Sequence, residues 1–212
     1  MKAVRIDRLA PGRPEGIDWL PLRAELGISA FGVSAYRADA GEPVVPRHFE
    51  KSGAGAGVHE ELYVVVRGRA TFTVEGATVD APQGTCVFVP PGEQREARAE
   101  EPGTTVLAVG APPGEAYRIA PWEYAARAAC AAELRDVDEL ERVRDEGVAT
   151  YGEHVTMLYA SALISAQRGR HDEALDFLSR AAADEDFGDW IRESAPAEPL
   201  LEPVRDDPRF LR

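Results

Sequence analysis

Between residues 48 and 95 of this 212-residue chain, five side chains are the candidates for binding a ligand or moving a proton. They are His48, Glu50, His59, Glu61 and Arg95. Imidazole and carboxylate groups together can exchange protons with a substrate or ligate Fe, Mn, Ni or Zn. A guanidinium adds a fixed positive charge, which suits an anionic ligand or a buried carboxylate. The stretch therefore indicates acid–base, metal-binding or anion-binding chemistry.

Alternation along the chain indicates which way Arg95 points. In the sequence REARAE, Arg95 shares a face with Ala97 and Ala99, and the other face carries only charged residues. Arg95 is therefore expected to point inward, where a lone guanidinium is unfavourable. A carboxylate partner is expected for it, either Glu61 or Glu50.

The same alternation sorts the other candidates. It groups His59, Glu61 and Tyr63 on one face of their segment, and His48 with Glu50 on one face of another. Tyr63 is expected in the core with its hydroxyl at the mouth of a barrel. Cys86 shares a face with Phe88 among apolar neighbours and is interpreted as a small buried hydrophobe rather than a nucleophile.

Short apolar runs broken by Gly and Pro must position these side chains. The runs cover residues 28–36, 62–66, 70–74, 85–89, 95–99 and 104–109. They predict an antiparallel meander or Greek key that has to close on itself or be covered. Apolar residues of the N-terminal segment 4–22 are expected to cover one edge, within the chain or across a homodimer.

The second half of the chain has helical spacing. Helices are predicted over 122–134, 137–151, 156–167 and 172–183, with a hairpin around Arg168-Gly169-Arg170. Small residues in that hairpin (Ala162, Gly169, Ala174, Ala181) stand at offsets that resemble a tetratricopeptide repeat. One repeat makes only a small helical domain. The paired prolines at 112–113 place the boundary, giving domains 1–114 and 115–212.

Two passages carry a more specific signal. Glu61 is followed by six residues and Gly68, and Gly84 is followed by five residues and Pro90-Pro91-Gly92. They resemble the two motifs of the cupin superfamily, G-x5-H-x-H-x3,4-E-x6-G and G-x5-P-x-G-x2-H-x3-N, over about residues 28–110. The resemblance implies a cupin-type antiparallel β-barrel. Together with the helical second half, it predicts a mainly β chain in which the barrel is followed by a small α-helical, tetratricopeptide-like domain.

The departures from the motifs concern the metal ligands, which in cupins are two His, a Glu and a later His. Here Glu50 stands in the second His position, ten residues separate it from Glu61, and Arg95 occupies the place of the later His. In a metal-binding interpretation His48, Glu50, His59 and Glu61 would hold a divalent transition metal. A metal-free interpretation is favoured, because Arg95 brings a cation to the vacated position.

The resemblance implies a small-molecule-binding protein, either a binder or an enzyme acting on an anionic organic substrate. Arg95 and Glu50 would bind the ligand, Glu61 would act as partner or general base, and His48 or His59 as acid, base or ligand, with Tyr63 beside them. The Gly-rich segment 52–57 is interpreted as a flexible lid or an insertion beside the mouth of the barrel. Two alternatives stay open: a non-catalytic scaffold with a sealed barrel and a partner-binding helical domain, and a metal-dependent oxygenase or isomerase.

Composition limits the partners. With 44% hydrophobic and 29% charged residues the chain can form a core, and its net charge of −13 disfavours nucleic acid and anionic membranes. The start, MKAVRID, lacks the apolar run of a signal peptide, and two cysteines make no disulfide framework. A cytoplasmic location is therefore expected.

Overall fold

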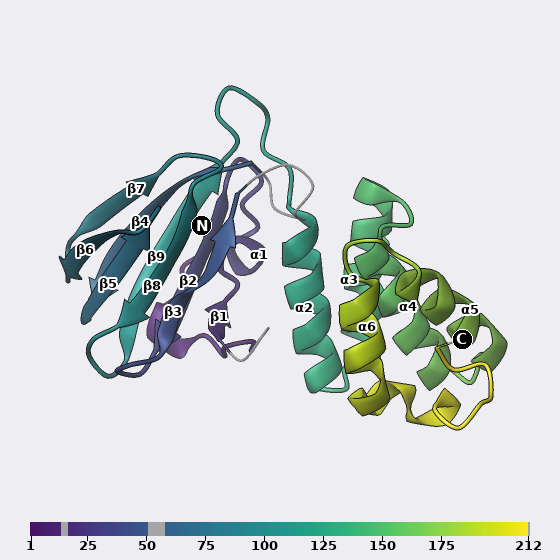
Figure 1. The fold of residues 1–212 in the computed structure, drawn as a ribbon. Helices are drawn as coiled ribbons and strands as arrows, with labels where there is room; N and C mark the ends of the chain where they lie inside the picture. The colour runs from purple at the N-terminus through teal and green to yellow at the C-terminus, as the bar shows by residue number, and fades with distance from the viewer. Residues whose placement is uncertain (14–16, 51–57, 212) are drawn as a thin grey trace. The chain divides into compact units, whose positions relative to one another are not determined.

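The computed structural model describes residues 1–13, 17–50 and 58–211, which form two compact units (Figure 1). The β unit comprises Met1–Ala120 and the helical unit Pro121–Arg212. Each has its own buried apolar core. No helix in the described ranges is long and apolar enough to cross a membrane.

The β unit consists of two antiparallel sheets. The five-stranded sheet has the order β1 (Asp18–Leu20), β2 (Gly32–Ala38), β9 (Thr104–Ala111), β4 (Glu60–Arg67), β7 (Cys86–Val89). The four-stranded sheet has the order β3 (Pro43–Phe49), β8 (Gln94–Ala99), β5 (Arg69–Val74), β6 (Ala77–Pro82). Side chains from both sheets, including Tyr63, Phe72 and Val106, form one core cluster. The predicted antiparallel β fold is confirmed.

All six predicted runs become strands, whereas β1, β3 and β6 were not predicted. β3 contains Pro46 and two register irregularities against β8, so it lacks a clean alternating pattern. β6 has exposed side chains along most of its length because it is an edge strand. Neither segment therefore shows the apolar run that marks a buried strand.

The N-terminal segment covers one edge of the five-stranded sheet within the chain. β1 pairs antiparallel with β2, so β2 is not an open edge. Leu20 and Leu22, the latter in the short helix α1 (Leu22–Leu26), form a cluster with Ala35 against which Ile6 and Leu9 pack. The prediction of an N-terminal cover is confirmed, and the homodimer stays a prediction.

Cys86 corrects the sequence interpretation, because the structure places it in an exposed position. It lies on the outer face of β7 with Phe88, while Val87 and Val89 point into the core. The run TCVFV is apolar at most positions, so hydrophobicity did not distinguish its two faces. Alternation assigns Cys86 and Phe88 to one face, and that face is the outer one.

The helical unit begins at Pro121. It contains α2 (Pro121–Glu133), α3 (Val137–Tyr151), α4 (Val155–Gln167), α5 (His171–Ala182) and α6 (Gly188–Ser194), followed by the 3-10 turns η3 (Ala195–Ala197) and η4 (Pro199–Val204). The four predicted helices are confirmed to within one residue at each end, and α6 was not predicted. Ala162, Ala174 and Ala181 are buried in the α4–α5 hairpin. Its tetratricopeptide-like character stays a prediction.

The structure explains why a glycine stands at position 68, in the first motif. Gly68 ends β4 with φ +74°, and a Cβ there would lie 2.5 Å from Thr104 Oγ1 and 3.0 Å from Thr104 Cα. Gly84, in the second motif, also has a positive φ (+90°), but a Cβ there would meet nothing within 4 Å. Gly68 is thus required by backbone angle and by packing, and Gly84 by angle alone.

We expect Gly68→Ala to destabilise the β unit more than Gly84→Ala does. Both substitutions place a Cβ in the left-handed region, at about 1–2 kcal/mol. Gly68→Ala adds the collision with buried Thr104, and overpacking of this kind typically costs about 1–3 kcal/mol. Urea unfolding of the two variants measures the difference. Equal losses of unfolding free energy in the two variants would show that Thr104 moves aside without a measurable cost.

Candidate functional site

The six polar side chains singled out in the sequence meet between the two sheets. His48 lies in β3, Glu50 follows it, His59 precedes β4, Glu61 and Tyr63 lie in β4, and Arg95 lies in β8. Within the four-stranded sheet His48 is the register partner of Arg95. Glu61 comes from the five-stranded sheet and points inward with Tyr63. The site therefore depends on both sheets.

Arg95 is completely buried, with 0% of its surface exposed. Its Nε lies 3.5 Å from Glu61 Oε2, and its Nη2 donates a hydrogen bond of 3.1 Å to the Pro90 carbonyl. Nε and Nη1 have no hydrogen-bond partner within the described part of the chain. The predicted inward direction and carboxylate partner of Arg95 are confirmed.

Glu61 is the centre of the cluster. Its Oε2 accepts a short hydrogen bond from the Tyr63 hydroxyl and lies 3.6 Å from His48 Nε2. Burial alone would raise the pKa of Glu61, but His48, Tyr63 and Arg95 together outweigh it and hold the pKa below its ordinary value. Burial, together with the charge of Glu61, raises the pKa of Tyr63 well above its usual range. Glu61 is therefore a carboxylate, and Tyr63 a permanent donor to it.

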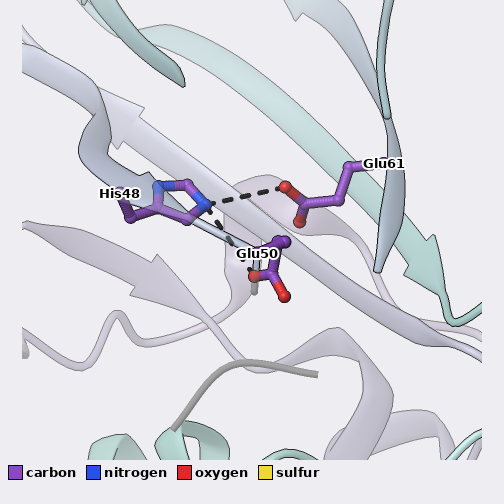
Figure 2. Close-up of side chains that lie close together, drawn as sticks. All are labelled: His48, Glu50 and Glu61. Atoms are coloured by element: carbon purple, nitrogen blue, oxygen red, sulfur yellow. Dashed lines mark ion pairs between the residues drawn. The ribbon is translucent and has the colours of Figure 1, made fainter. Parts of the chain in front are cut away.

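His48 faces two carboxylates, as Figure 2 shows. Its Nε2 lies 3.6 Å from Glu61 Oε2 and 3.9 Å from Glu50 Oε1, while Nδ1 lies 2.7 Å from the Pro46 carbonyl. Nδ1 therefore carries a proton for the carbonyl, and Nε2 faces the carboxylates. Burial would lower the pKa of His48, but Glu61, the Pro46 carbonyl and Glu50 outweigh it and raise the pKa. The two carboxylates therefore favour the protonated form of His48.

His59 lies beside Glu50 and is almost buried, with 8% of its surface exposed. Its Nδ1 is 3.7 Å from Glu50 Oε2, and its ring packs against Tyr117 at 5.6 Å between centroids. Burial lowers the pKa of His59, so burial favours the neutral form of its imidazole, in contrast to His48. The segment 52–57, interpreted from sequence as a lid or an insertion, lies outside the described residues.

Tyr117 was missed in the sequence analysis. It follows β9 in the stretch that joins the two units, and it reaches His59 across more than fifty residues of sequence. Nothing in the local pattern around Tyr117 marks this contact. The available signal was a tyrosine in the short stretch between Pro113 and Pro121.

His48, Glu50 and Glu61 form a group of possible ligands for a divalent metal. One ligand atom each from His48, Glu50 and Glu61 lies within 4.8 Å of the others, a spacing that a cation can bridge. Charge argues against it. Glu61 already pairs with the buried Arg95, and a divalent ion between Glu50 and Glu61 would add further positive charge next to that guanidinium. The buried guanidinium therefore disfavours a metal beside Glu61.

We expect Arg95→Met to destabilise the β unit strongly. Removing one member of a buried ion pair leaves the other unpaired and typically costs about 3–5 kcal/mol. Arg98→Met, on the exposed face of the same strand, is the matched control and should change stability by roughly 0.5 kcal/mol or less. Adding Glu61→Leu to Arg95→Met should recover part of the loss. A loss for Arg95→Met as small as for Arg98→Met, in chemical unfolding, would contradict the ion-pair role.

The raised pKa of His48 should make the stability of the β unit depend on pH. A histidine whose pKa is raised by folding contributes stability below its ordinary value of 6.5, and that contribution is lost as pH rises through the folded-state pKa. The stability difference between the wild type and His48→Gln should therefore shrink as pH rises from about 5.5 to 8.5. Urea unfolding of both proteins across this range measures it. If the stability difference between the wild type and His48→Gln instead grew with pH, folding would lower the pKa of His48, and the prediction would be wrong.

Comparison with known proteins gives the family. Residues 31–164 match the family described as AraC-like ligand binding domain. No curated protein matches the sequence. Among the solved structures that match is an RmlC-like cupin from Desulfovibrio desulfuricans, with 21% identity, a TM-score of 0.43 and coverage of 53% of this chain and 97% of that one.

Two further structures are similar. A predicted oxalate decarboxylase from Thermotoga maritima has 19% identity and a TM-score of 0.42, over 51% of this chain and 97% of that one. KdgF from Halomonas sp. has 19% identity and a TM-score of 0.35, over 43% and 72%. The motifs, the two antiparallel sheets and the family match support the cupin superfamily. The family match covers more than half of the residues of this chain, so the chain belongs to the AraC-like ligand-binding domains.

Proposed function

We propose that the β unit binds a small polar organic molecule beside His48, Glu50 and Glu61. One observation carries the proposal: a charged cluster drawn from both sheets is buried on the Arg95 side and accessible at His48. The Arg95 side chain is 0% exposed, those of Glu50 and Glu61 are 11% and 13% exposed, and that of His48 is 30% exposed. Membership in a family of ligand-binding domains supports the same site.

The exposed end of the cluster favours a ligand that both donates and accepts hydrogen bonds. Glu50 and Glu61 offer carboxylate oxygens to hydroxyl or amino groups, and protonated His48 offers a donor. An anionic substrate, predicted from sequence, would meet His48 as its nearest cation. Arg95 would act from behind, by keeping Glu61 ionised, rather than by direct contact.

The same groups can move protons. His48 has a pKa raised from 6.5, which makes it an acid near neutral pH, and Glu61 is an ionised carboxylate 3.6 Å from it. A ligand group between the two would be placed for proton donation by His48 and acceptance by Glu61. Turnover of an organic substrate is thus the enzymatic form of this proposal.

A metal-binding function is the second candidate, and the close spacing of His48, Glu50 and Glu61 favours it. These three residues would hold the ion, with His59 adjacent through Glu50. A divalent ion would supply Lewis-acid activation of a bound oxygen atom. The buried guanidinium of Arg95 beside Glu61 ranks this candidate below the metal-free site.

The two candidates are separated by analysing protein purified without an affinity tag or a chelator. We expect native mass spectrometry to show a retained small molecule, or a panel of polyols, amines and carboxylic acids to contain one that raises the melting temperature. Elemental analysis should find no stoichiometric transition metal, and chelator should leave the melting temperature unchanged. Glu61→Gln should weaken ligand binding at least about tenfold, a loss of about 1.4 kcal/mol.

Glu60→Gln is the matched control, because Glu60 is adjacent in β4 but exposed on the other face. It should bind the ligand as the wild type does. About one metal ion per chain, lost in His48→Gln, would establish the second candidate instead. A protein that retains nothing and responds to no compound would favour the sealed-barrel scaffold.

A further inference from the structure

A strip without side chains lies on the inner face of the five-stranded sheet next to the site. Gly110 of β9 is the register partner of Glu61 on one side and of Gly32 of β2 on the other. Opposite residues in an antiparallel pair share a face, so both glycines face the same side as Glu61. Two adjacent strands therefore leave space beside the charged cluster.

The surroundings of the two glycines show what uses that space. A Cβ on Gly32 would lie 3.1 Å from the Tyr117 hydroxyl oxygen and 3.3 Å from Tyr117 Cε2. A Cβ on Gly110 would lie 3.1 Å from Glu61 Cγ and 3.4 Å from His59 Cβ. Neither glycine has a positive φ, so close packing is what favours glycine here. Tyr117 occupies one end of the strip, and the His59–Glu61 segment the other.

Tyr117 also contacts the site directly. Its ring lies 5.6 Å from the His59 ring, tilted by 36°, and His59 Nδ1 lies 3.7 Å from Glu50 Oε2 on its other side. His59 precedes β4, so the ladder of the sheet does not fix its side chain. An aromatic neighbour on one side and a carboxylate on the other restrict the plane of the imidazole.

We propose that Tyr117 is a positioning residue of the ligand site: seated over Gly32, its ring holds the His59 imidazole beside Glu50. The segment between β9 and Pro121, which leads into the helical unit, thereby supplies one wall of the site. The role of this wall in binding rests on the function proposed above. The position of the ring, and its effect on His59, do not.

The test uses NMR of the histidine imidazoles in the full chain without added ligand. A ring at this distance shifts the carbon-bound protons of His59 through its ring current. Tyr117→Leu, which keeps apolar bulk but removes the ring, should abolish that shift, and Tyr117→Phe should preserve it. Gly32→Ala should displace the ring and change the His59 signals without altering either aromatic partner. Phe88→Ala, an exposed aromatic on the outer face of β7, is the matched control and should leave them unchanged.

Chemical modification gives a second readout. Diethylpyrocarbonate should modify His59 several-fold faster in Tyr117→Leu than in the wild type or Tyr117→Phe, as followed by peptide mass spectrometry. His154, in the helical unit, should react at one rate in all variants and reports on intact folding. Wild-type His59 signals and modification rate in Tyr117→Leu would overturn the proposal. Because both readouts need no ligand, a protein that binds nothing would refute the proposed function without affecting this result.

Discussion

The ion pair between Arg95 and Glu61 is the interaction on which the β unit and its site both depend. It joins the four-stranded sheet to the five-stranded sheet through two charges that are removed from water. A buried guanidinium requires a carboxylate, and a buried carboxylate requires donors beyond one ion pair. Tyr63 and His48 meet that second requirement, and His48 in turn brings Glu50 into the cluster. Burial of Arg95 thus accounts for Glu61, and burial of Glu61 accounts for the donors around it.

Much of this arrangement could be predicted from sequence, because alternation is local and strict. The pattern REARAE was sufficient to predict that Arg95 points inward and needs a carboxylate partner, although the choice between Glu61 and Glu50 stayed open until the structure placed Glu61 beside it. The four long helices between Pro121 and Ala182 could be predicted as well, whereas the short helix α6 could not. Both predictions use information contained within a single element.

The features that escaped prediction are those that depend on pairing between elements. His48 meets Glu61 because β3 aligns with β8 through two register irregularities, and no local pattern reports where an irregularity falls. Tyr117 reaches His59 from a stretch with no periodicity. Cys86 lies in an almost uniformly apolar run, where burial of one face or both gives the same sequence. The sequence therefore predicted the direction in which a single side chain points more reliably than the residues that it contacts.

The charged cluster is held by strands that belong to different sheets. His48 lies in β3 and Arg95 in β8 of the four-stranded sheet, whereas Glu61 and Tyr63 lie in β4 of the five-stranded sheet. The residues of the proposed ligand site are thus the same ones that join the two sheets in the core. A substitution that changes what the site can bind therefore also changes the stability of the β unit, and the two properties cannot vary independently.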